Sequence, residues 1–231
     1  YAVSYKNKPV VLSSALGVSL KDKTALVNHF EVMGTTTHAV NETWKPVLGE
    51  QAQIVNHYNE LIVALVQKDS KVKLNLVFRA FDEGVAFRYD FPKQENLNYF
   101  IISDEKTEFN LTENNKVLWI PGDFDSNEYV YNETKFSEID NEKLNLNNGI
   151  GVKSIPGKYT VQTPLQMKSP SGLYLNIFEA AVVNYPVMHL DANVQKYTLK
   201  ANLVPNAIGD KAYLQAPCVS TWRTIMVSDD A

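Results

Sequence analysis

Cysteine is almost missing from this sequence. Cys218 is the only one among 231 residues, so an intramolecular disulfide is excluded, and so are zinc sites built on paired cysteines. No apolar run approaches the roughly 18 residues that a membrane-spanning helix requires. The first residues lack the charged and apolar regions of a signal peptide, and the chain does not begin with Met. We therefore expect a processed or trimmed chain that does not span a membrane.

A strong charge of one sign is also absent. The 22 Lys and Arg against 26 Asp and Glu leave a net charge of −4, with 45% apolar and 21% charged residues. This balance is typical of a folded soluble domain, and it provides no basic field to attract nucleic acid. The hydrolase motifs G-x-S-x-G and H-E-x-x-H do not occur. The histidines are far apart, and we expect surface residues or hydrogen-bonded strand residues at His29, His38, His57 and His189.

What the sequence does contain is alternation with a period of two. From Lys71 to Ala80, apolar and polar residues alternate, and alternation resumes from Val85 to Phe91. Between them, Phe81-Asp82-Glu83-Gly84 has the composition of a tight turn, with Gly84 free to adopt positive φ. Pro92 closes the second run. These features predict a β-hairpin with one buried face.

The same period predicts further strands, in residues 173–178, 197–203 and 219–227. Residues 9–20 and 23–32 have the pattern of a first pair of strands joined at Lys21-Asp22. Residues 58–66 fit a helical stripe or a buried strand, and the turn that follows favours the strand. Residues 135–144 fit a short helix or an ordered loop. We predict one all-β domain over residues 1–231, a large antiparallel two-sheet sandwich with at most short helices.

Two groups of residues have the composition of ligand sites. The run from Asp123 to Glu128 begins like an EF-hand loop, but Glu128 stands where that loop needs Gly and Thr134 where it needs Glu. An EF-hand is therefore excluded, and a solvated acidic loop is the simpler interpretation. Aromatic rings near turns can stack on sugars, and the candidates for such a substrate-binding role are Trp44, Trp119 and Tyr129. The alternative for each ring is ordinary packing in the core.

Glu179 ends an apolar strand pattern. By parity it shares the face of Leu173, Leu175 and Ile177, and an inward carboxylate is costly unless it is paired, protonated or bound to a metal. The spacing leaves three interpretations open. A bulge turns the side chain outward, an Arg such as Arg223 pairs with it, or it has a function.

Three blocks of the sequence, Phe78–Tyr89, Leu173–Pro186 and Thr221–Val227, resemble the N-terminal domain of glycoside hydrolase family 97. They occur in the family's order, and the resemblance extends from about Val3 to the last residue. It implies a β-super-sandwich that precedes a catalytic (β/α)₈ barrel in a longer enzyme. A barrel needs on the order of 250 residues, so the resemblance implies a truncated N-terminal domain with no catalytic residue in this chain.

The resemblance also implies a function for the parent enzyme. Members hydrolyse α-glycosidic bonds of oligosaccharides, as bacterial periplasmic α-glucosidases or as α-galactosidases, and a glutamate of the N-terminal domain helps to coordinate a catalytic Ca²⁺. The matching residue is Glu179. The barrel would supply most of the six to eight oxygen ligands of calcium. The alternatives are a stand-alone carbohydrate-binding sandwich and a mutarotase-like enzyme, which would need a general acid and base such as His with Glu.

Overall fold

The computed structural model describes residues 1–144 and 154–230. In these ranges the chain forms β-strands and two single-turn 3₁₀ helices, η1 (Phe136–Glu138) and η2 (Asn141–Lys143), so the predicted all-β class is confirmed. None of the helices in this part of the chain is long and apolar enough to cross a bilayer. Residues 135–144, predicted as a short helix or an ordered loop, contain both 3₁₀ turns.

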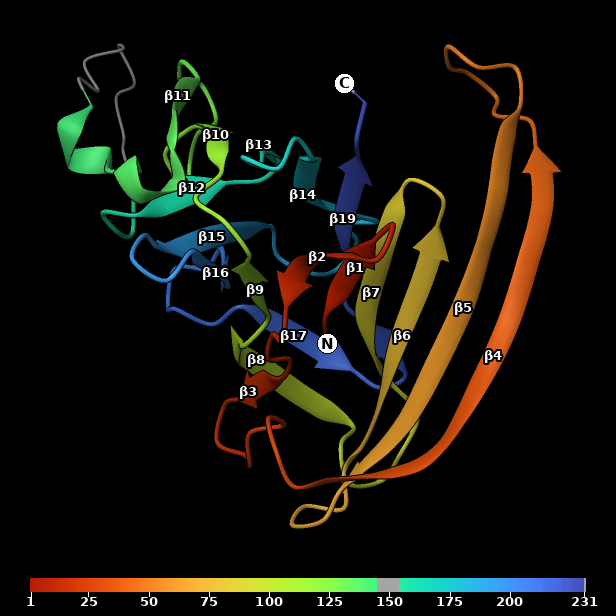
Figure 1. Cartoon of the computed structure of the whole chain (residues 1–231). Coiled ribbons are helices and arrows are strands. Elements are labelled where there is room, and N and C mark those ends of the chain that lie inside the picture. The colour runs from red at the N-terminus through yellow and green to blue at the C-terminus, as the bar shows by residue number, and fades with distance from the viewer. Residues whose placement is uncertain (145–153, 231) are drawn as a thin grey trace.

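Within the described ranges, the strands form three antiparallel sheets (Figure 1). One sheet has the order β1-β2-β9-β16-β15-β12, a small one has the order β17-β8-β3, and the largest has the order β11-β10-β13-β14-β19-β7-β6-β5-β4, with β18 paired to β7. The strand bounds are β1 (Val3–Tyr5), β2 (Lys8–Leu12), β3 (Val18–Leu20), β4 (Phe30–Trp44), β5 (Ile54–Gln67), β6 (Lys73–Phe81), β7 (Gly84–Phe91), β8 (Tyr99–Glu105), β9 (Glu108–Leu111), β10 (Lys116–Trp119), β11 (Asn132–Lys135), β12 (Thr160–Gln162), β13 (Leu165–Lys168), β14 (Tyr174–Ala180), β15 (Met188–Asn193), β16 (Thr198–Leu203), β17 (Ala212–Gln215), β18 (Cys218–Val219) and β19 (Trp222–Ser228).

The core lies between the large sheet and the two smaller ones. Alternate residues of β7 point into it, and Phe87, Tyr89 and Phe91 are at most 1% exposed. Phe109 of β9 packs on Phe87 from the opposite side. Alternation of this kind is what a strand with one buried face requires. The hairpin predicted from the sequence is therefore confirmed as β6 and β7.

Gly84 is required at the hairpin turn for a reason that its local sequence does not show. A Cβ atom built on Gly84 would clash with the backbone carbonyl oxygen of Ile225 in β19. Gly84 pairs with both Phe81 and Met226. The absence of a side chain therefore lets the turn pack directly against the neighbouring strand.

The predicted first pair of strands is corrected by the structure. Residues 23–29 are not a strand, and β3 pairs with β8 rather than with β4. The long strand β4 pairs instead with β5, which confirms the strand interpretation of residues 58–66. The pairing of β3 with β8 joins residues far apart in the sequence, which the local pattern does not show.

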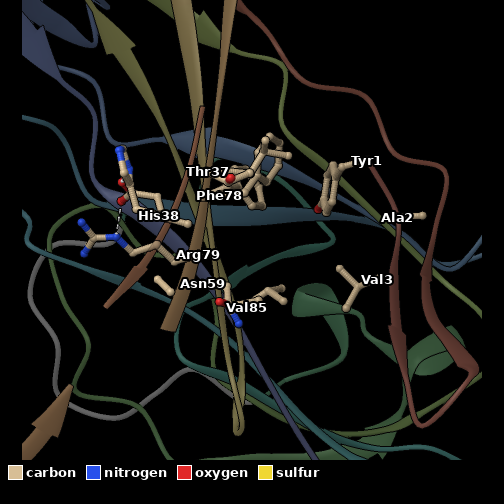
Figure 2. Close-up of a pocket in the computed structure, with 14 residues that line it drawn as sticks. Tyr1, Ala2, Val3, Thr37, His38, Asn59, Phe78, Arg79 and Val85 are labelled. Atoms are coloured by element: carbon tan, nitrogen blue, oxygen red, sulfur yellow. Dashed lines mark hydrogen bonds and ion pairs between the residues drawn. The ribbon is translucent and has the colours of Figure 1, made fainter. Parts of the chain in front are cut away.

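The β4–β5 hairpin extends past the rest of the large sheet as an arm (Figure 1). Its connecting segment is exposed, with Val47 98% and Leu48 89% accessible. Nearer the core, Tyr1 and Val3 face the inner side of this sheet across a hollow of about 530 Å³. Figure 2 shows that hollow, with Phe78 and Val85 among the lining residues.

Candidate functional site: a buried carboxylate cluster and an adjoining polar hollow

Glu179 points into the sandwich from β14. The register of β14 on β19 places it opposite Arg223, and its Oε2 accepts a hydrogen bond from Arg223 Nη1 at 2.6 Å. Its Oε1 accepts from the backbone N–H of Met188 at 2.9 Å, and the side chain is 8% exposed. The inward orientation predicted from parity is confirmed, and Arg223 is the partner that the ion-pair interpretation named.

Arg223 joins Glu179 to a second, fully buried carboxylate. Its Nε and Nη2 donate to Glu105 at 2.9 and 2.7 Å. Glu105 also accepts from Tyr185 Oη at 2.9 Å and from Thr107 Oγ1 at 2.7 Å. Burial alone would raise the pKa of Glu105, but the charge of Arg223 and these hydrogen bonds hold it below its ordinary value. Glu105 is therefore well compensated as an anion.

Glu179 is less well compensated than Glu105. Burial raises its pKa, and Arg223 and the N–H of Met188 offset that effect only in part. One guanidinium thus faces two carboxylates, so the cluster of Glu105, Arg223 and Glu179 has a net charge of −1 when all three are ionised. A positive charge beside Glu179 would neutralise the net charge of the cluster.

Glu179 fits a metal only as one ligand among several. Each carboxylate oxygen retains a lone pair beyond the hydrogen bond that it accepts. Among residues 1–144 and 154–230, however, His, Cys, Asp and Glu side chains do not gather in any group of three that would hold a metal ion. Calcium takes six to eight oxygens, so the other ligands would have to come from outside this part of the chain.

A polar hollow of about 670 Å³ adjoins the cluster through the loop between β14 and β15. Tyr185, whose hydroxyl group contacts Glu105, lines it on one side, with Pro186 and Val187. The β10–β11 loop lines the other side from Asp123 to Glu128.

Asp123 holds this β10–β11 loop in shape. Its Oδ1 accepts from the backbone N–H groups of Asp125 and Ser154 at 2.9 and 3.1 Å, and its Oδ2 from Tyr129 Oη at 2.5 Å. Burial would raise the pKa of Asp123, yet these hydrogen bonds lower it. Asp125 accepts a hydrogen bond from Ser154 Oγ and is exposed. The turn resembles a calcium loop in sequence, but its most buried carboxylate already accepts hydrogen bonds from two donors of the loop, Asp125 and Tyr129, and from Ser154.

His189 of β15 completes the floor of the hollow. It is 3% exposed, its ring lies 5.5 Å from that of Phe124, and its Nδ1 is buried with no hydrogen-bond partner among the described residues. Burial lowers its pKa to about 4, against the opposing effect of Asp123 and Asp191. The sequence predicted a surface residue or a hydrogen-bonded strand residue here; His189 does lie on a strand, but its Nδ1 lacks the predicted hydrogen bond among the described residues. The other three histidines are exposed, as predicted: His29, His38 and His57.

The three aromatic candidates for sugar stacking lie apart from one another. Trp119 is 1% exposed and its Nε1 donates to Thr134 Oγ1 at 3.0 Å, so the expectation of a sugar platform is corrected by its burial in the core. Trp44 is 49% exposed at the end of β4, on the arm. Tyr129 is half-buried and tied to Asp123. The sequence signal that best locates the hollow is the acidic loop rather than the tryptophans.

These features define an antiparallel β-sandwich domain with an under-compensated carboxylate at the end of a central strand. The chain belongs to the glycosyl-hydrolase 97 N-terminal family, whose model matches residues 1–231. The resemblance inferred from the sequence is thereby confirmed.

The solved structures most similar to this chain include glycoside hydrolase family 97 enzymes. A variant from Pseudoalteromonas sp. strain K8 has a TM-score of 0.84 at 30% identity, and an enzyme from the same source in complex with acarbose has 0.83 at 30%. Each match covers 99% of this chain and 32% of the matched enzyme's chain. A beta-arabinopyranosidase shares the fold, with a TM-score of 0.79 at 19% identity over 99% of this chain and 36% of that one. This chain thus spans about a third of the enzymes that it matches.

Proposed function

We propose that this chain is the non-catalytic N-terminal domain of an α-glucosidase-like enzyme that hydrolyses α-glucosidic bonds of starch-derived oligosaccharides. The observation that carries the proposal is the match over 99% of the chain, at 30% identity, to family 97 enzymes whose structures hold acarbose or panose. Panose is built of α-linked glucose, which supports glucose over galactose. The domain packs on a (β/α)₈ catalytic barrel, and the parent enzyme is bacterial and periplasmic.

Glu179 is the residue through which the domain would take part in catalysis. It donates one carboxylate ligand to a Ca²⁺ whose other ligands come from the barrel. The net charge of −1 on the Glu105–Arg223–Glu179 cluster supports this role, as do the lone pairs that remain on Glu179. When bound, the ion supplies positive charge near the scissile bond. Arg223 and the N–H of Met188 hold the carboxylate in a fixed orientation.

The activity is tested on the full-length protein that the gene encodes. Purified protein is assayed for release of glucose from maltose and panose, with and without a calcium chelator. We expect hydrolysis that the chelator abolishes and added Ca²⁺ restores. Release of galactose from α-galactosides in place of glucose, or no hydrolysis of either, would overturn the proposed specificity.

The calcium role is tested by Glu179→Gln in the same protein. The substitution removes the charge but keeps the shape, so we expect calcium affinity and kcat to fall at least tenfold while stability drops by about 1 kcal/mol, the value of one hydrogen bond. Glu60→Gln is the matched control, because Glu60 also pairs with an arginine but lies on β5, outside the cluster. Unchanged calcium affinity in Glu179→Gln would remove Glu179 from the proposed site.

A further inference from the structure

Arginine is rare in this chain and concentrated in one place. Only three of the 22 basic residues are arginines, Arg79, Arg88 and Arg223, and they lie on the neighbouring strands β6, β7 and β19. Arg79 and Arg223 each form an ion pair with glutamate. Arg88 has no ion pair or hydrogen bond within residues 1–144 and 154–230, and its Nε is buried without a partner. One arginine of the three therefore lacks an anion.

Arg88 lies on the outer face of the large sheet. Phe87 and Tyr89 of β7 point into the core, so Arg88 between them points the other way. Its Cζ lies 4.4 Å from the centre of the Trp222 ring, and Cζ of Arg79 lies 4.5 Å from the same ring. Figure 2 shows Arg79 on the side of the sheet away from the N-terminal residues that line the hollow. Two guanidinium groups thus share one indole ring on this face.

The surroundings of Arg88 disfavour its charge. Burial lowers its pKa, and the like charge of Arg79 lowers it further, against the opposing effect of Asp90 and Glu60. Glu60 is already paired with Arg79, and Asp90 accepts a hydrogen bond from Asn75 Nδ2 at 3.0 Å. A carboxylate that accepts two parallel hydrogen bonds from a guanidinium group offsets such a cost. Of the three nitrogens only Nε is both buried and unpartnered, so Nη1 and Nη2 are the groups that a carboxylate can reach.

Apolar side chains border this cation. Trp222 belongs to a small apolar cluster on the outer face, and Ala180 packs against that cluster. In the loop that follows Ala180, Val182 is 44% and Val183 is 68% exposed. Trp222 itself is 8% exposed, so its ring offers little surface for stacking on a sugar. An unpaired guanidinium group beside exposed valines is instead typical of a protein interface.

The position of this surface selects its occupant. Ala180 directly follows Glu179 on β14, and a catalytic domain that supplies calcium ligands beside Glu179 must approach this end of the strand. The enzymes that this chain matches are about three times its length. A carboxylate-bearing surface of the same protein's catalytic domain therefore fits both the charge and the place of the unpaired arginine.

We propose that the outer face of the large sheet around Arg88 and Trp222, with the two exposed valines, packs on the catalytic domain, and that a carboxylate of that domain accepts hydrogen bonds from Nη1 and Nη2 of Arg88. The proposal rests on the proposed function and adds the surface through which the two domains meet. The carboxylate neutralises the guanidinium group, and contact between the domains buries Val182 and Val183.

The first test identifies the group that faces position 88. In the full-length protein, Arg88→Lys replaces the guanidinium group by an amine, and a water-soluble carbodiimide joins amines to carboxylates in contact with them. We expect mass spectrometry of the digested protein to find position 88 joined to an Asp or Glu beyond residue 231. Leu12→Lys is the control, because Leu12 is also exposed but lies on β2 in another sheet, and we expect no such link. A link from position 88 to Glu60, to Asp90 or to a second copy of the chain, or no link, would overturn the proposal.

The second test examines the exposed valines. Val183→Asp places a charge on an exposed loop, so this domain retains its fold, but contact with the catalytic domain buries that charge. We expect the calorimetric midpoint of the full-length protein to fall by roughly 5 °C. Ile208→Asp is the matched control, since Ile208 is 72% exposed in the loop between β16 and β17, and we expect no shift. Equal midpoints for the two variants would contradict the proposed surface.

Both readouts are independent of turnover. The expected cross-link in a protein that does not cleave α-glucosides would retain the interface and remove the proposed function. Hydrolysis of α-glucosides without the cross-link would retain the proposed function and remove the interface.

Discussion

Arg223 is the cation of the buried carboxylate cluster, and its removal would leave two carboxylates without their partner. It is fully buried and makes hydrogen bonds to two carboxylates, one of them, Glu105, with no exposed side-chain surface. Removing one partner of a buried ion pair leaves an uncompensated charge, which costs about 3–5 kcal/mol. We expect Arg223→Met to lower the free energy of unfolding by that amount, measured by urea denaturation at pH 7.

Arg79→Met is the matched control for Arg223→Met. Arg79 also pairs with a glutamate, Glu60, at 2.8 Å, but its side chain is 27% exposed. Solvent screens such a pair, so the expected loss is about 1 kcal/mol. Equal losses in the two variants would contradict the importance assigned to the buried cluster.

His189 makes stability depend on pH in a direction that follows from its burial. Its pKa is about 4 in the folded protein and about 6.5 in an unfolded chain, so the unfolded chain binds the proton more readily. Stability attributable to His189 is therefore complete above pH ~6.5 and falls as the pH drops towards 4, by up to about 3 kcal/mol. We expect the decrease between pH 7 and pH 4.5 to be smaller in His189→Phe, measured by urea denaturation. Parallel curves for the two proteins would show that His189 is not held neutral.

For single residues, the sequence predicted which face of a strand a side chain occupies better than it predicted the groups that surround it. Strand parity placed Glu179 on the buried face, because an alternating pattern needs only local residues. The environment of His189 depends on segments that are distant in the sequence: the ring of Phe124, in the loop between β10 and β11, lies 5.5 Å from the ring of His189. Burial of Trp119 likewise depends on strands β11 and β13 on either side of β10. No local pattern contains that information.

Among the elements, the β6–β7 hairpin shows how a turn is constrained by a strand outside it. Gly84→Ala would push a methyl group into the carbonyl oxygen of Ile225, so the hairpin and β19 must separate or strain. We expect a loss of about 2–3 kcal/mol, the range of backbone and overpacking effects. The measurement is the melting temperature, and Gly34→Ala in β4 is the control.

Gly34 differs from Gly84 in its surroundings, and it lacks the positive φ of Gly84. A Cβ atom at Gly34 would meet nothing within 4 Å, and alanine restricts the unfolded chain, so the control should be neutral or slightly stabilising, by at most about 1 kcal/mol. A similar loss in both variants would mean that the turn does not depend on the approach of β19.

The local sequence predicted this hairpin correctly, but the prediction for residues 9–32 was wrong. The reason is that β3 pairs with β8, and several other strands lie between these two in the sequence.

For the whole molecule, strand order in the large sheet brings together segments that are far apart in the sequence. β19, near the end of the chain, lies between β14 and β7 and contributes Arg223 to the core. The arm formed by β4 and β5 contrasts with β19, because the segment that connects its two strands is exposed (Figure 1). The burial of a segment is therefore a better guide to its contribution to stability than its length.

Two deletions test this difference. Replacing residues 45–53 by Asn-Gly, a turn that suits a tight hairpin, should leave the melting temperature within a few degrees of the wild-type value, because the removed residues bury little. Removing residues 222–231 should abolish the cooperative thermal transition and the near-ultraviolet circular dichroism signal, since β14 and β7 lose their shared partner and Glu105 loses Arg223. A cooperative transition in the second deletion would show that the sandwich folds without its central strand. Loss of the transition in the first would show that the arm contributes to the core, which its exposure argues against.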